Sequence, residues 1–173
     1  ICPVNTILNQ LAKRVGLEYD HDGLMARTGS VDAVLLEKLN DLAYYELIPP
    51  KSLGFEWTNS FIWPIINESK LSVADLLWTV VEHVAIQLAH SLSEFEKGKI
   101  LVTGGGAKNV FLIERFAAHS KHKLVIPENK IIDYKEALIF AFLGVLRVRG
   151  EVNCLRSVTG AARDSVGGAI YLP

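Results

Sequence analysis

The chain has 173 residues, of which 50% are hydrophobic and 21% are charged, and its formal net charge is −1. This length and composition are those of one ordinary globular domain with a substantial core. The balance of charge, with no basic run, argues against nucleic acid and anionic membranes as main partners, and no apolar stretch is long enough to predict a membrane span.

The two cysteines and the first residues say little about chemistry. Cys2 and Cys154 are far apart, and neither has metal-ligand spacing around it, so we expect two reduced thiols and no metal site. The chain opens on Ile1, without an initiator methionine or a signal-peptide pattern. We therefore expect a piece of a longer protein.

The first half of the sequence has the hydrophobic spacing of helices. A first helix is predicted from Asn5, a good N-cap, and a second from Ser30. After a proline pair at positions 49 and 50, the aromatic-rich residues 51–57 are predicted to be a loop. Ser72, with an acid three residues later, resembles a capping box and predicts a long helix that ends at Gly98.

The pattern changes after that helix. Residues 99–103 predict a short buried strand, and residues 104–106 are three glycines followed by another helix. Residues 124–126 predict a second strand, and residues 133–149 a helix rich in Ala, Leu and Phe. This order is typical of an α/β fold in which the two strands are parallel.

The three glycines indicate a close contact with a ligand. A glycine is needed where a ligand must approach bare backbone, and a helix N-terminus beside it favours phosphate. The alternative is a tight turn that binds nothing. The sequence lacks the Gly-Lys-Ser/Thr of a P-loop. A dinucleotide-binding turn would use Gly104 and Gly106 with Glu128 as the acid, but Asn109 stands where that motif has its third glycine.

A third interpretation rests on a family pattern. The run Gly104-Gly105-Gly106-Ala107-Lys108-Asn109 resembles the adenosine-binding turn of the anhydro-N-acetylmuramic acid kinases. Other segments match that family in the same order: Cys2-Pro3-Val4-Asn5, Tyr19-Asp20-His21-Asp22-Gly23, Gly29-Ser30-Val31, residues 49–54, Asp133-Tyr134-Lys135-Glu136-Ala137, Ser157-Val158-Thr159-Gly160-Ala161 and Gly168-Ala169-Ile170-Tyr171. The resemblance covers essentially the whole chain.

The resemblance implies an actin-like (ribonuclease H-like) ATPase lobe, with a central mixed sheet flanked by helices. Residues 1–173 would form the C-terminal lobe of a two-lobe cytoplasmic sugar kinase, with the N-terminal lobe missing from this chain. The family uses ATP, magnesium and water to open the 1,6-anhydro ring of anhydro-N-acetylmuramic acid and to phosphorylate O6, in peptidoglycan recycling. Phosphoryl transfer needs positioning and charge neutralisation, and ring opening needs a general base.

The resemblance also implies roles for particular residues. Gly104, Gly105, Gly106 and Asn109 are the expected nucleotide contacts, and Asn5, Lys51 and Glu136 are the expected substrate contacts. Asn109 and Asn5 are also candidates for helix caps, Glu136 for a first-turn acid and Lys51 for a solvated lysine. The family's general-base aspartate would precede Ile1, so no catalytic residue is expected in this chain, which alone should be inactive.

Three positions depart from the family pattern. Cys2 and Val4 replace two glycines, and Phe55 stands where the family has an arginine. They motivate an alternative function, in which the chain is a non-catalytic relative that binds nucleotide or a partner protein. The expected partners are the amino sugar and the protein's own N-terminal lobe, with a second copy of the chain as a further candidate.

Overall fold

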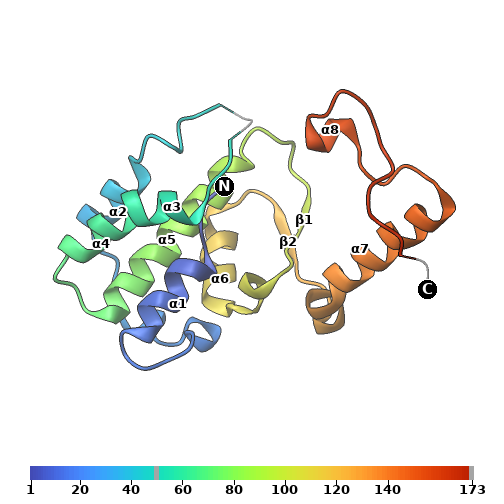
Figure 1. Ribbon diagram of the computed structural model, residues 1–173. Coiled ribbons are helices and arrows are strands. Elements are labelled where there is room, and N and C mark those ends of the chain that lie inside the picture. Colours follow the sequence, from blue (N-terminus) through green and yellow to red (C-terminus); the bar gives the residue numbers. More distant parts are fainter. Residues whose placement is uncertain (49–50, 172–173) are drawn as a thin grey trace. The chain divides into compact units, whose positions relative to one another are not determined.

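The computed structural model describes residues 1–48 and 51–171, and the chain divides into two units (Figure 1). Unit 1 is Ile1–Pro127 and unit 2 is Glu128–Pro173. The proline pair at positions 49 and 50, which the sequence predicts to end the second helical region, lies outside the described residues.

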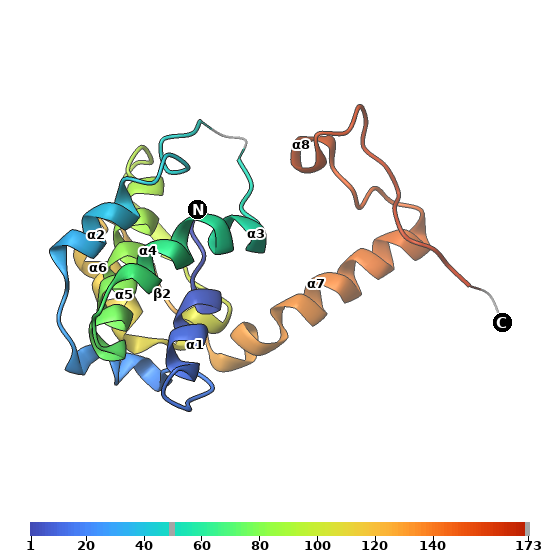
Figure 2. The same ribbon diagram turned by 60° about the vertical axis from the view of Figure 1, so that its left-hand side comes forward.

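Unit 1 is a group of helices around one long central helix. Its helices are α1 (Asn5–Lys13), α2 (Ala33–Asn40), α3 (Phe55–Trp57), α4 (Trp63–Glu68), α5 (Val73–Ser91) and α6 (Val110–His119). Helix α5 packs against α1, α2 and α6, and Figure 2 shows it running through the middle of the unit. Leu77, Val80 and Val84 of this helix are fully buried. The core of unit 1 is therefore built around α5.

The start of α5 agrees with the prediction, and its end does not. The Ser72 hydroxyl accepts a hydrogen bond from the Asp75 N–H at 3.2 Å, as expected of an N-cap. The helix ends at Ser91 and not at Gly98. Most side chains between these two residues are exposed. Because helices in proteins are stabilised mainly by packing of an apolar face, an unpacked segment does not extend α5.

Helix α2 begins later than its predicted start at Ser30. Its N-cap is Asp32, whose carboxylate accepts from the Leu35 N–H at 2.7 Å. The Ser30 N–H and hydroxyl both bind the Asp75 carboxylate, at 2.7 and 3.0 Å. Ser30 therefore binds the first turn of α5, and Asp32 caps α2 in its place.

The aromatic segment predicted as a loop is helical from Phe55 onward. Helix α3 leads through a π-helical turn (Thr58–Ile62) into α4. Trp57 stacks on Phe61, four residues later, with ring centroids 5.6 Å apart. Trp63 lies in the core. Side chains four residues apart meet on one helix face, so these aromatic contacts favour a helix over the predicted loop.

The sheet of unit 1 has two parallel strands. Strand β1 (Lys99–Leu101) pairs with β2 (Lys123–Val125), with Ile100 opposite Leu124. The predicted neighbouring parallel strands are confirmed, and the chain is α/β. The prediction that the first strand is buried is wrong, because Leu101 is 62% exposed. The predicted central mixed sheet is not observed, because within residues 1–48 and 51–171 only these two strands form a sheet. Helix α6 and the glycine turn connect them.

Helix α6 is fixed to α5 by a charged cluster. The nearly buried Glu82 carboxylate accepts two hydrogen bonds from the Arg115 guanidinium, at 2.6 and 2.8 Å, and is 2.8 Å from Nε2 of His119. Burial alone would raise the pKa of Glu82, but the hydrogen bonds from Arg115 and His119 outweigh it and lower that pKa. This cluster holds the second half of α6 against α5.

Unit 2 contains α7 (Asn129–Arg149) and the short helix α8 (Arg156–Thr159). Helix α7 begins four residues before the predicted residue 133. Across the described residues both cysteines are free thiols, as expected, and burial raises the pKa of the Cys2 thiol to about 12. None of the described helices is long and apolar enough to cross a membrane.

Candidate functional site

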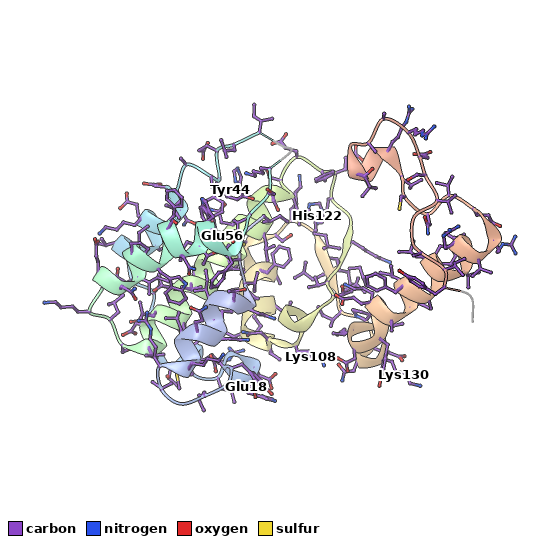
Figure 3. All side chains as sticks on the ribbon, in the orientation of Figure 1. Glu18, Tyr44, Glu56, Lys108, His122 and Lys130 are labelled. Carbon is purple, nitrogen blue, oxygen red and sulfur yellow. The ribbon has the colours of Figure 1, made fainter. Side chains whose placement is uncertain are left out.

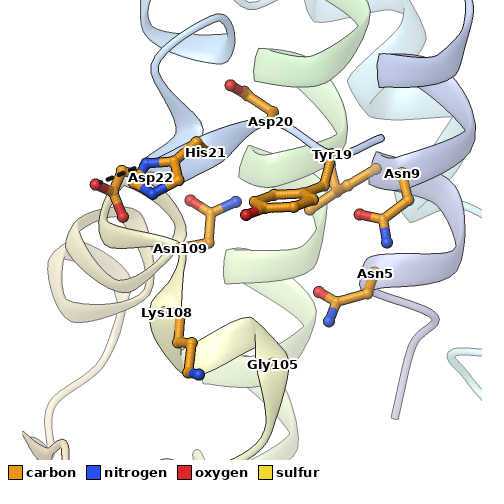
Figure 4. A pocket seen from close by; sticks show the side chains of 10 residues that line it. Asn5, Asn9, Tyr19, Asp20, His21, Asp22, Gly105, Lys108 and Asn109 are labelled. Carbon is orange, nitrogen blue, oxygen red and sulfur yellow. Dashed lines mark ion pairs between the residues drawn. The ribbon is translucent and has the colours of Figure 1, made fainter. Parts of the chain in front are cut away.

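Three segments of unit 1 enclose a pocket of about 300 Å³ (Figure 4). They are the first two turns of α1, the loop that follows α1, and the glycine turn before α6. The pocket is lined by Asn5, Leu8 and Asn9 of α1, by Tyr19, Asp20, His21 and Asp22 of the loop, and by Gly105, Lys108 and Asn109 of the turn. Most of these residues are polar, which suits a polar ligand.

The glycines of the turn have different reasons to be glycine. Gly104 has φ of +82°, a backbone angle that residues with a side chain rarely adopt. A Cβ on Gly105 would lie 2.8 Å from Nδ2 of Asn5, whereas one on Gly106 would make ordinary contacts. Backbone conformation therefore explains Gly104 without a ligand, whereas the Asn5 amide near Gly105 is the end of a side chain that can shift. The bare backbone of Gly105 lines the pocket.

Asn5 does not cap its helix. Val4 occupies the N-cap position of α1, and no side chain accepts a hydrogen bond there. Asn5 is already inside the helix, so its amide is directed to the glycine turn, beside Gly105 and Gly106. The interpretation of Asn5 as a cap is therefore wrong, and its predicted ligand role stays a prediction. Asn9, four residues later on the same face, lines the pocket as well.

Asn109 caps α6, as one of its two predicted roles requires. Its Oδ1 accepts from the Leu112 N–H at 3.0 Å. Asn109 also lines the pocket, so capping fixes the position of an amide whose Nδ2 still has donors to offer. Lys108 is exposed at the end of the same turn (Figure 3). The turn thus brings a cation and an amide to one wall of the pocket.

The loop that follows α1 is held by a buried carboxylate. Asp20 is 8% exposed and accepts hydrogen bonds from the N–H groups of Met25, at 2.8 Å, and Ala26, at 2.9 Å. Asp22 has φ of +55°, and its carboxylate lies 3.1 Å from Nδ1 of His21. This loop was part of the family pattern but was not predicted to line the site. Its concentration of polar and aromatic residues was the available signal.

Replacing Asp20 with Asn should lower the free energy of unfolding by about 2 kcal/mol. Asn keeps one acceptor oxygen but presents an NH2 group to the second backbone N–H. Denaturation with urea would measure the loss. Asp22→Asn is the matched control, because Asp22 is half-exposed and Asn tolerates its backbone conformation. The control should change stability by less than about 0.5 kcal/mol. Equal losses in the two variants would contradict the conclusion that the Asp20 carboxylate holds the loop.

Lys51 does not line this pocket, and Glu136 belongs to unit 2. The Lys51 ammonium donates to the carbonyls of Tyr44, at 3.1 Å, and Tyr45, at 3.0 Å, so it is not simply solvated. Glu136 is exposed and lies well inside α7, which begins at Asn129. The alternative of a first-turn acid is therefore wrong for Glu136. The substrate roles of both residues stay predictions.

The pocket offers hydrogen-bonding groups rather than a metal centre. Within the described part of the chain, no three His, Cys, Asp or Glu side chains cluster as metal ligands. The glycine-turn wall carries the Lys108 cation and exposed backbone, and the facing loop carries the aromatic rings of Tyr19 and His21. Such a pocket can hold a ligand that has an anionic part and a flat part.

Comparisons with known proteins agree with the sequence pattern. The family model described as "Anhydro-N-acetylmuramic acid kinase" matches residues 1–173. Proteins of that name from Xanthomonas axonopodis pv. citri and Vibrio cholerae are 35% and 37% identical to the chain. These alignments cover 98% and 90% of this chain but 47% and 44% of the relatives. The chain thus spans about half the length of these curated relatives, and it belongs to the anhydro-N-acetylmuramic acid kinase family.

Proposed function

We propose that this chain is the nucleotide-binding, C-terminal lobe of an ATP-dependent anhydro-N-acetylmuramic acid kinase with an actin-like fold. The enzyme opens the 1,6-anhydro ring of its substrate with water and phosphorylates O6, in the cytoplasm, as part of peptidoglycan recycling. The observation that carries the proposal is the pocket, in which the family's glycine turn, with Lys108 and Asn109, faces Asn5 of α1.

The residues of the pocket suit a nucleotide. The exposed backbone of Gly105 admits close approach, and the Lys108 ammonium would neutralise phosphate charge. Magnesium binds proteins through few carboxylates and stays with phosphate oxygens and water, so it needs no cluster of acids here. Bound magnesium and ATP supply the phosphoryl group and its charge compensation, while this chain's residues position the nucleotide.

A second lobe is part of the proposal. The chain matches about half the length of its relatives. We assign the general-base aspartate to a position preceding Ile1, and the first phosphate loop to the other lobe. Catalysis then requires both lobes, because positioning of the sugar and activation of water come from different segments.

The test is a kinase assay with anhydro-N-acetylmuramic acid, ATP and magnesium. The full-length protein should release ADP and form the 6-phosphate, and residues 1–173 alone should form none. Turnover by the isolated chain would contradict the two-lobe proposal. ADP binding by the full-length protein without turnover would identify the non-catalytic alternative, which the changes at Cys2, Val4 and Phe55 motivate.

A further inference from the structure

Tyr19 presents an aromatic ring to the pocket without a structural reason to do so. The side chain is 51% exposed, and within the described residues its hydroxyl has no hydrogen-bond partner. Figure 4 shows the ring between Asn9 and Asn109, on the side of the pocket that faces the Gly105 turn. A half-exposed ring contributes little to folding but leaves apolar surface available to a ligand.

The loop that carries Tyr19 is rigid where it meets the pocket. The next residue, Asp20, is buried and holds two backbone N–H groups. Gly23 approaches α6 so closely that an added Cβ would lie 2.5 Å from the Cβ of Phe111. The His21 ring lies 6.1 Å from the Tyr19 ring with an angle of 30° between them, and it extends the aromatic surface. The ring is thus presented in a fixed place, as a binding surface must be.

The amides around the ring can read the edge of a heteroaromatic base. Asn5 and Asn9 line the same pocket, and in the described part of the chain neither side chain has a hydrogen-bond partner. An amide both donates and accepts, which matches the adjacent donor and acceptor on the edge of adenine. Lys108 lies on the turn, where it would take the phosphate end of the ligand (Figure 4).

We infer that Tyr19 is the stacking surface for the adenine of the bound nucleotide. The base lies against the Tyr19 ring, its edge meets the Asn5 and Asn9 amides, and its phosphates extend toward Lys108. This assignment rests on the proposed function, because it needs the pocket to bind a nucleotide. Tyr19 would then determine base recognition from the loop after α1, in addition to the contacts made by the glycine turn.

The test is calorimetric titration of the full-length protein with ADP and with inorganic tripolyphosphate, a ligand that has phosphates but no base. Tyr19→Leu should weaken ADP binding about tenfold, because stacking on an aromatic ring contributes energy of that order. The same variant should bind tripolyphosphate as the parent does. Tyr19→Phe, which keeps the ring, should bind ADP as the parent does. Phe95→Leu, which also removes an exposed ring from unit 1, should bind both ligands normally.

A Lys108→Met variant separates the inference from the proposed function. It should weaken ADP and tripolyphosphate together. If it does so while Tyr19→Leu leaves ADP affinity unchanged, or weakens both ligands equally, the stacking role is wrong and the nucleotide pocket stands. If the parent protein binds neither ligand, the proposed function fails and the stacking role fails with it.

A second variant removes the dependence on how Tyr19→Leu folds. Tyr19→Trp places an indole in the pocket, and ADP should quench its fluorescence, measured as the difference from the parent with its Trp57, Trp63 and Trp78. Tripolyphosphate should not quench it. Quenching of equal size by both ligands, or by neither at saturating ADP, would overturn the stacking assignment.

Discussion

Acidification from pH 7 to pH 4 should lower the free energy of unfolding by about 3 kcal/mol through His83 alone. His83 is 1% exposed, and burial lowers its pKa from the ordinary 6.5 to about 4. In the unfolded chain the imidazole binds a proton below pH 6.5, but in the folded chain it stays neutral until about pH 4. The proton therefore favours the unfolded state in this window, and stability is lost as the pH falls through it.

The hydrogen bonds of His83 agree with a neutral ring. Its Nδ1 donates to Oδ1 of Asn40 at 2.7 Å, because an amide oxygen can only accept. Its Nε2, 2.9 Å from the Tyr45 hydroxyl, is then the acceptor, and the hydroxyl donates. The Tyr45 hydroxyl could turn and accept from a protonated Nε2. Burial is therefore the cause of the lowered pKa of His83.

The measurement is urea denaturation between pH 7 and pH 4 of the parent and of His83→Gln. The variant cannot titrate at this position, so its loss on acidification should be about 3 kcal/mol smaller than that of the parent. His90→Gln, at the exposed end of the same helix, is the control and should follow the parent. Parallel curves for the parent and His83→Gln would show that His83 does not govern acid stability.

Gly23→Ala should destabilise the chain by about 3 kcal/mol, of which about 1 is backbone strain and the rest is steric. Gly23 has φ of +71°, and its added Cβ would lie 2.5 Å from the Cβ of Phe111 and 2.7 Å from Oδ1 of Asn109. Neither contact can be relieved by rotating a long side chain. The loop must move away from α6, which also displaces Tyr19 and Asp22 from the pocket.

The chain contains a matched control for this prediction. Gly16 has φ of +82°, and an added Cβ there would meet nothing within 4 Å. Gly16→Ala should therefore cost only the backbone strain, about 1 kcal/mol. The difference between the two variants in thermal or urea denaturation isolates the contact with α6. Losses of the same size would mean that the loop is free to shift and does not depend on close packing.

The parts of the fold that could be predicted are those with a local signal. The Ser72 cap predicted the start of α5, and short apolar runs beside glycine and proline predicted β1 and β2. The helical segment from Phe55 was missed because its evidence is the stacking of Trp57 on Phe61, which composition alone does not distinguish from an aromatic loop. The end of α5 was missed because no sequence signal shows where packing stops.

The candidate site also has one part with a local sequence signal and one part without it. The glycine turn could be predicted, since its spacing and composition are local. The loop after α1 could not be placed beside it, because Gly23 and Phe111 are far apart in sequence and meet only through the packing of α6 on α5. Asn5 was interpreted as a cap for the same reason, as only the folded chain shows that its amide faces Gly105.

The polar side chains buried on α5 have a consequence for how uniquely unit 1 assembles. An apolar helix inside a bundle can slide by one turn, about 5.4 Å, and still bury similar surface. On α5, Thr79 accepts from the Asp32 N–H at the start of α2, Glu82 binds Arg115 of α6, and Gln87 donates to Asn40 at the end of α2. A shift of one turn would break all three contacts and leave a buried carboxylate unpaired. These residues select a single alignment of the helices, and the glycine turn inherits that alignment through α6.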